Sequence, residues 1–186
     1  MNHIVYRDAL FLIVAILVGA TGIMMSYLAD PSKLQETQVE SPGAIIVTVS
    51  WPPGSEDVDT WLMGPGEETA VFYRQKSGKT WDLLRDDLGL VNDPTPLNFE
   101  NAYTRGEPDG AYRINVLCYT CLNKREVPVT VEVKERSPDG KTTRLVDRST
   151  VVLTKDGEER TAIAFTVRDG TIDKGSINRL FERLAK

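Results

Sequence analysis

Two patterns of apolar and polar positions divide the chain. The first is an apolar run from Ala9 to Ala29 that contains no charged residue and is bounded by Asp8 and Asp30. Its length matches the roughly 20 residues that a helix needs to cross a bilayer. From Ala44 onward the pattern changes, and apolar and polar residues alternate as in half-buried strands. The sequence therefore predicts one transmembrane helix followed by an all-β domain.

Seven segments of the second part have a strand-like alternation or composition. Turn sequences separate them, among them Pro138-Asp139-Gly140 and Lys155-Asp156-Gly157. Residues 76–105 are less regular. Short strands at this spacing predict an antiparallel β-sandwich, jelly-roll or immunoglobulin-like, with a barrel as the alternative. The predicted strands span residues 44–51, 58–63, 70–75, 110–119, 127–133, 145–153 and 160–167.

The C-terminal residues show a helical period. Ile177, Leu180, Phe181 and Leu184 recur at steps of three and four, and Ser176 is a suitable N-cap. We expect a short amphipathic helix that packs on the sandwich or, alternatively, docks on a partner or on the membrane surface. The predicted organisation is a cytoplasmic N-terminus (1–8), a transmembrane helix (9–29), a tether (30–43), a β-sandwich (44–170) and a C-terminal helix (171–186).

The apolar run ends at Tyr27-Leu28-Ala29, which lacks the small-x-small exit of a cleaved signal peptide. We therefore expect an uncleaved anchor, with a signal peptide as the alternative. Arg7 before the run favours a cytoplasmic N-terminus, which places the β domain in the periplasm or outside the cell, on a single-pass protein of the inner membrane. Small residues on one face of the helix either pack against a second membrane helix, its own copy or a partner's, or reflect the ordinary composition of membrane helices. They are Ala15, Gly19, Gly22 and Ser26.

Charge and histidine content exclude several function classes. The formal net charge is −5, which argues against a nucleic-acid binder. The single histidine, His3, precedes the apolar run, so the β domain has no imidazole for a serine triad or a usual zinc site. No complete catalytic constellation is present, and we do not expect an enzyme.

Acidic residues gather in three short segments of the β domain. Carboxylates two residues apart on a strand share a face, and calcium prefers six to eight oxygen ligands from several segments. These residues bind calcium if the fold brings them together; otherwise they are solvated loop and edge charges. No other cofactor is expected. The candidate ligands are Asp57, Asp59, Asp86, Asp87 and Glu100.

Cys118 and Cys121 form a Cys-x-x-Cys pair at the end of a predicted strand. Because no helix N-terminus activates a thiol there, a local disulfide is favoured over two free thiols or an oxidoreductase site. The bridge requires a turn or bulge, since residues three apart on a regular strand face opposite sides. Trp51, Trp61 and Trp81 show no common spacing, which favours packing over carbohydrate stacking.

The region from Ser50 to about Tyr119 resembles a broad group of bacterial envelope β-sandwich domains. The resemblance rests on Asp57-x-Asp59-x-Trp61, Asp86-Asp87-Leu88-Gly89, Asn98-x-Glu100 and the segment from Asp109 to Val116. That group includes a domain of unknown function with Asp-x-Asp-Leu and Gly-x-Tyr-x-Val strands. The region is also similar to the pre-peptidase C-terminal domains that follow secreted proteases. The resemblance implies a non-catalytic sandwich that is sometimes stabilised by calcium.

These observations predict a membrane-anchored, non-catalytic extracytoplasmic module that serves as an accessory or interaction subunit of an inner-membrane complex. The alternative is a calcium- or glycan-binding module at the cell surface. A thiol-disulfide enzyme is a third hypothesis.

Overall fold

The computed structural model describes residue 6 and residues 11–21, 43–88, 97–121, 126–137 and 139–185. The chain forms two units, Met1–Glu40 and Ser41–Lys186. In the first unit residues 11–21 are helical, and the Thr21 hydroxyl donates to the carbonyl oxygens of Leu17 and Val18. Among the residues described, no helix has both the length and the apolar character needed to cross a membrane. Of the predicted span 9–29 the structure describes residues 11–21, and of the predicted tether 30–43 it describes residue 43; the remaining residues lie outside the described part of the chain.

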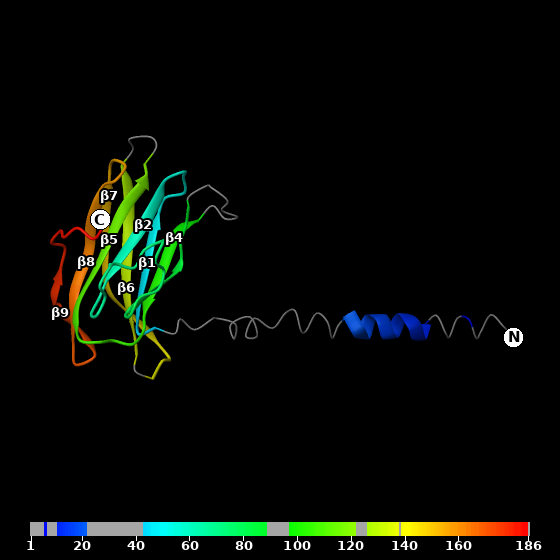
Figure 1. Cartoon of the computed structure of the whole chain (residues 1–186). Coiled ribbons are helices and arrows are strands. Elements are labelled where there is room, and N and C mark those ends of the chain that lie inside the picture. The colour runs from blue at the N-terminus through cyan, green and yellow to red at the C-terminus, as the bar shows by residue number, and fades with distance from the viewer. Residues whose placement is uncertain are drawn as a thin grey trace. The chain divides into compact units, whose positions relative to one another are not determined.

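The second unit is a sandwich of two antiparallel sheets, which confirms the predicted β-sandwich (Figure 1). One sheet has the order β3-β4-β1-β6-β7 and the other β2-β5-β8-β9. The strands are β1 (Ile45–Trp51), β2 (Asp57–Met63), β3 (Trp81–Arg85), β4 (Asn98–Thr104), β5 (Gly110–Thr120), β6 (Val127–Arg136), β7 (Thr143–Leu153), β8 (Glu159–Arg168) and β9 (Thr171–Asn178).

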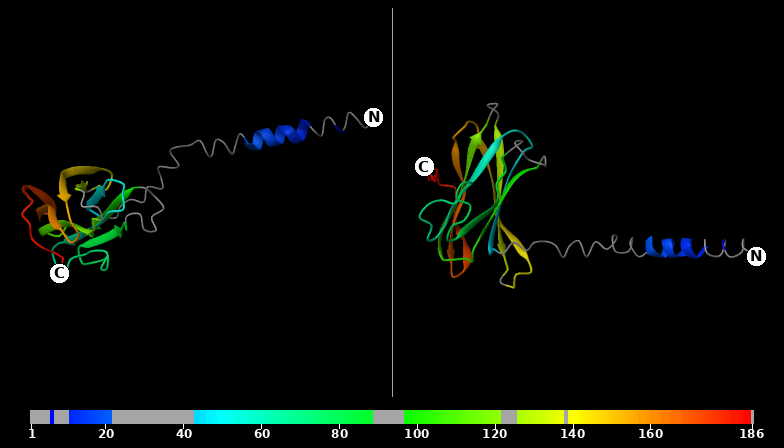
Figure 2. Two further views of the ribbon diagram at one scale, coloured as in Figure 1. Left: turned by 90° about the horizontal axis from the view of Figure 1, so that it is seen from above. Right: turned by 45° about the vertical axis from the view of Figure 1, so that its right-hand side comes forward.

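The core lies between the two layers, which Figure 2 shows from two further directions. The predicted alternation of buried and exposed positions in β1 and β6 is confirmed. Ile45, Val47 and Val49 of β1 point inward and are buried, and the odd-numbered valines of β6 are buried in the same way. Trp81 and Tyr112 meet edge to face in this core with ring centroids 5.9 Å apart. The Tyr112 hydroxyl donates to the Pro108 carbonyl at 2.7 Å, so the buried ring keeps its polar atom paired.

The middle of the domain differs from the sequence-based prediction. Residues 70–75 do not form a regular strand; isolated bridges join Val71 to Leu62 and Phe72 to Gln75. Two unpredicted strands, β3 and β4, follow within the segment that looked irregular. Three of the four inward positions of β4 hold buried polar residues, Asn98, Glu100 and Thr104, and the fourth is the small Ala102. This composition hides the apolar alternation that normally reveals a strand.

The predicted C-terminal helix is wrong. Residues 171–178 form strand β9, paired with β8, and residues 179–185 continue without helical structure. Asp169 and Gly170, both with positive φ, make the tight turn between β8 and β9, as an Asp-Gly pair does in hairpins. The segment after β9 (red in Figure 1) is held by Glu159, the first residue of β8. The buried Glu159 carboxylate accepts the backbone N–H of Leu184 at 2.7 Å. These non-local hydrogen bonds override the helical period.

Candidate metal centre

The acidic cluster is assembled from three strands that belong to both sheets. Asp57 and Asp59 come from β2, where a register shift against β5 lies between Asp57 and Val58. Asp86 directly follows β3. Glu100 lies on β4 and points inward between the layers, where it is fully buried. The cluster therefore connects the edge strand β2 of one sheet to β3 and β4 in the other.

Three of the carboxylates lie close enough to share one ion. Oxygen atoms of Asp59, Asp86 and Glu100 are all within 4.8 Å of one another. One oxygen of Glu100, Oε2, accepts the backbone N–H of Thr60 at 2.8 Å, which ties β4 to the edge strand β2. Lys76 Nζ lies 3.2 Å from Asp86 Oδ2 and offsets part of the negative charge.

Four oxygens of this cluster are buried and have no hydrogen-bond partner among the described residues. An unpaired buried polar atom is rare in proteins, and its usual explanation is a ligand, an ion or a water molecule. Three of the residues that carry these oxygens, Asp59, Asp86 and Glu100, are grouped within 4.8 Å, and the charge of Asp57 acts on Asp59 as well, which makes this the strongest indication of a binding site among the described residues. The four oxygens are Asp57 Oδ1, Asp59 Oδ2, Asp86 Oδ1 and Glu100 Oε1.

The electrostatics of the cluster favour either protons or a cation. Burial, followed by the charges of Asp57 and Asp86, raises the pKa of Asp59 to about 7. Burial and the charges of Asp86 and Asp87 raise the pKa of Asp57 to about 6, and burial raises the pKa of Glu100 well above its ordinary value. Like charges that cannot all ionise together share protons unless a cation neutralises them.

Asp87, the fifth predicted ligand, has a different partner. Its Oδ2 accepts from Arg85 Nη2 at 2.9 Å and from the backbone N–H of Phe99 at 3.1 Å. Arg85 in turn lies over the Phe99 ring, 4.0 Å from its centroid. Asp87 therefore fixes the segment after β3 against β4 and positions Asp86 beside Glu100.

The donor set is composed only of carboxylate oxygens, which suits a hard divalent cation such as Ca²⁺. The buried, unpaired oxygens of Asp59 and Glu100 fit such an ion, with water completing the coordination. A substrate of ordinary size does not fit this arrangement, because Asp59 is only 4% exposed and Glu100 is 0% exposed. The sequence missed the supporting roles of Lys76 and the Thr60 N–H, since neither belongs to a recognisable motif.

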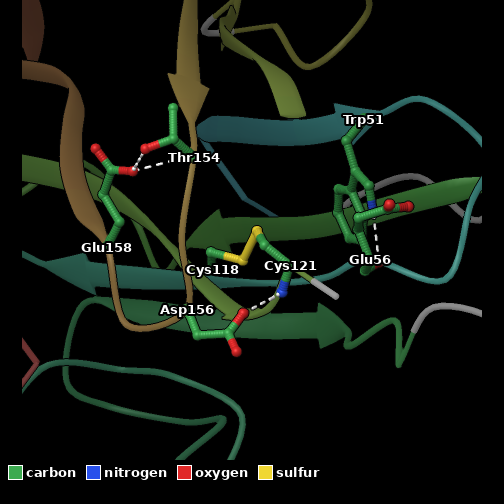
Figure 3. The surroundings of a disulfide bond; sticks show 7 residues. All are labelled: Trp51, Glu56, Cys118, Cys121, Thr154, Asp156 and Glu158. Carbon is green, nitrogen blue, oxygen red and sulfur yellow. Dashed lines mark hydrogen bonds between the residues drawn. A yellow bond between two sulfur atoms is a disulfide. The ribbon is translucent and has the colours of Figure 1, made fainter. Parts of the chain in front are cut away.

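The predicted disulfide between Cys118 and Cys121 is confirmed, with Cα atoms 6.0 Å apart (Figure 3). It lies at the end of β5, next to the register shift against β2, in agreement with the expected turn or bulge. Asp156 Oδ1 accepts the Cys121 N–H at 2.5 Å. The two sulfurs bond to each other, so neither is a thiolate ligand for a metal beside Asp156.

Of the predicted helix-packing residues, Ala15 and Gly19 lie on the helix of residues 11–21 with their surfaces exposed. Gly22 and Ser26 lie outside the described residues. Of the tryptophans, Trp51 and Trp81 are buried and Trp61 is only partly buried. Trp51 Nε1 donates to the Glu56 carbonyl at 2.9 Å (Figure 3).

Comparison with known proteins identifies no relative of the chain. No protein-family model matches the chain, and no curated protein or solved structure matches it significantly. The resemblance to envelope β-sandwich domains therefore stays a prediction.

Proposed function

We propose that the protein is a non-catalytic β-sandwich module that binds a divalent cation, with calcium as the best fit, between its two sheets. The observation that carries this proposal is the set of four buried, unpaired carboxylate oxygens on Asp57, Asp59, Asp86 and Glu100. A cation there joins β2 of one sheet to β3 and β4 of the other, so its binding energy adds to the stability of the fold.

The experiment is a thermal melt of the full-length protein at pH 8 in EDTA and in millimolar Ca²⁺. Calcium should raise the melting temperature of the wild type. Glu100→Gln keeps the acceptor for the Thr60 N–H and removes one charge, so it should melt higher than the wild type in EDTA and gain little from calcium. Glu132→Gln is the matched control, because Glu132 on β6 pairs with Lys134 and Arg148 and is not part of the cluster. Equal calcium responses of the wild type and Glu100→Gln would reject the site.

We also propose an immunoglobulin-like rather than a jelly-roll sandwich. The orders β6-β1-β4-β3 and β2-β5-β8 match the A-B-E-D and C-F-G sheets of that fold, with β6 in the place of its first strand. The bond from the Tyr112 hydroxyl to the Pro108 carbonyl, near the start of β5, corresponds to the tyrosine corner of such sandwiches.

A second function is compatible with the first. We propose that the apolar run from Ala9 to Ala29 anchors the module in the inner membrane, with the sandwich outside the cytoplasm, as an accessory or interaction subunit of a membrane complex. The disulfide between Cys118 and Cys121 supports an oxidising compartment. Maleimide labelling in intact cells, with and without prior reduction, tests the location: thiols that react without reduction would contradict it. Partner capture with a Gly19→Leu/Gly22→Leu variant tests the role of the helix.

A further inference from the structure

A second candidate site lies on the outer face of the sheet β2-β5-β8-β9, and none of its lining residues belongs to the acidic cluster. Leu62 and Ile114 point into the core, so their neighbours Trp61, Met63 and Arg113 face outward. Together with residues 69–75 and the C-terminal segment they line a cavity of about 390 Å³. Cavities of this size lie at the lower end of those that bind small molecules, roughly 300–1,000 Å³. The lining residues are Trp61, Met63, Thr69, Ala70, Phe72, Gln75, Arg113, Glu182, Arg183 and Leu184.

Stacked aromatic rings form one wall of this cavity. The rings of Trp61 and Phe72 are nearly parallel, 11° apart, with centroids separated by 4.1 Å. Beyond the cavity the row continues through Tyr73, whose ring meets Phe72 edge-on at 5.2 Å, to Tyr119 at 6.0 Å. Tyr119 is 54% exposed. A row of rings at the surface offers successive apolar contacts to an extended ligand.

The polar side chains of the cavity can hydrogen-bond a ligand, and their charges are balanced, so the ligand need not be charged. Arg113 pairs with Glu182, and Arg183 Nε lies 3.7 Å from Glu159 Oε2, so each lining charge has a counter-charge. Gln75 and Thr69 supply a neutral amide and a hydroxyl, joined at 3.1 Å. Planar amide, guanidinium and carboxylate groups beside an aromatic wall suit a ligand with adjacent hydroxyls and one apolar face.

We propose that this cavity, which we call the aromatic site, binds a neutral carbohydrate chain. One pyranose ring packs its C–H face against the wall formed by Trp61 and Phe72, and its hydroxyls bond to Gln75, Arg113 and Glu182. Further sugar units extend along Tyr73 and Tyr119. This activity goes beyond the proposed cation site, and the two sites share no residue.

The test is calorimetric titration of the full-length protein, in a zwitterionic detergent without sugar headgroups, with two probes: the β-1,4-linked tetramer of N-acetylglucosamine and cellotetraose. At least one tetramer should bind with a Kd of about 1 mM or tighter. Phe72→Ala should weaken binding about tenfold. Phe181→Ala is the matched control, because Phe181 is a 57% exposed aromatic residue outside the cavity, and it should leave binding unchanged.

Two further variants keep the result interpretable. Tyr119→Ala removes an exposed ring without disturbing the core and should weaken binding of the tetramer while the melting temperature is unchanged. Glu100→Gln should bind the tetramer like the wild type, so loss of the cation site and loss of the aromatic site are distinguishable. Absence of binding by both tetramers, or equal binding by Phe72→Ala and Phe181→Ala, would overturn the proposal.

Discussion

The cluster of carboxylates predicts an unusual dependence of stability on pH when no cation is present. Burial and neighbouring charges raise the pKa of Asp59 from 3.8 to about 7 in the folded protein. Between these two values the folded state binds a proton that the unfolded state releases, and stability therefore falls as pH rises through this window. We expect the protein in EDTA to be more stable at pH 5 than at pH 8.

The magnitude follows from the pKa shift of Asp59 alone. A carboxyl group with a pKa of 3.8 unfolded and about 7 folded loses about 2–3 kcal/mol of stabilisation between pH 5 and pH 8. For a domain of this size, that corresponds to a fall in melting temperature of about 10 °C. The pKa values of Asp57 and Glu100 are raised as well, so these groups, coupled to Asp59, also lower the stability as the pH rises.

The assay is differential scanning calorimetry at pH 5, 6, 7 and 8, in EDTA and in calcium. Few other groups titrate in this range, because the single histidine is His3, ahead of the β domain. Burial and the charge of Glu135 also raise the pKa of Glu107. The variant Asp59→Asn retains Glu107, so the difference between the wild-type and variant curves isolates the contribution of Asp59. Calcium should flatten the wild-type curve. A wild-type melting temperature in EDTA that stays constant or rises from pH 5 to pH 8 would show that the carboxyl group of Asp59 is not protonated in the folded protein in this range.

Three further predictions concern the frame around the site. Asp87→Asn should lower the free energy of unfolding, measured in urea, by about 2–3 kcal/mol, because the buried carboxylate binds both Arg85 and the Phe99 N–H. A change below about 0.5 kcal/mol would contradict the role of Asp87 in fixing the segment after β3 against β4. Replacing Cys118 and Cys121 together by serine should cost about 2 kcal/mol, since the disulfide closes a very short loop, and calorimetry showing a much larger loss would assign it more than local stabilisation. Tyr112→Phe should cost about 1 kcal/mol in a urea titration through the lost bond to Pro108, and an unchanged midpoint would argue against the tyrosine corner.

The strands of the sandwich were predictable where inward positions are apolar. In β1 and β6 the alternation of buried Ile and Val residues with polar residues is regular, so sequence and structure agree. In β4 three of the four inward positions carry Asn98, Glu100 and Thr104, and the alternation disappears. Glu100, a member of the candidate site, is thus one of the residues that made β4 unrecognisable from the sequence.

The C-terminal segment shows why a short periodic pattern is weak evidence. Leu180 and Phe181, two of the residues that suggested a helix, are 74% and 57% exposed, whereas Leu184 is buried. The segment is held by Glu159, far away in the sequence, and no local signal encodes that bond. One local signal for β9 was present, because Asp169-Gly170 is a typical hairpin turn.

For the candidate site, the sequence predicted a set of carboxylates but not their arrangement. It indicated Asp57, Asp59, Asp86, Asp87 and Glu100 as one set. Asp59, Asp86 and Glu100 lie within 4.8 Å of one another, Asp57 has a buried unpaired oxygen, and Asp87 pairs with Arg85. Which carboxylate faces the cluster depends on the bulge in β2 and on the pairing of β3 with β4. Such long-range geometry cannot be obtained from spacing along the chain.

Direct titration of calcium into the full-length protein decides whether the acidic cluster is a metal site. Calorimetry at pH 7 in two buffers of different ionisation enthalpy gives both the stoichiometry and the number of protons released. One Ca²⁺ should bind per chain with a net release of protons, because the raised pKa values of Asp59 and Glu100 leave protons for the ion to displace. No binding, or binding without proton release that persists in Glu100→Gln, would contradict it.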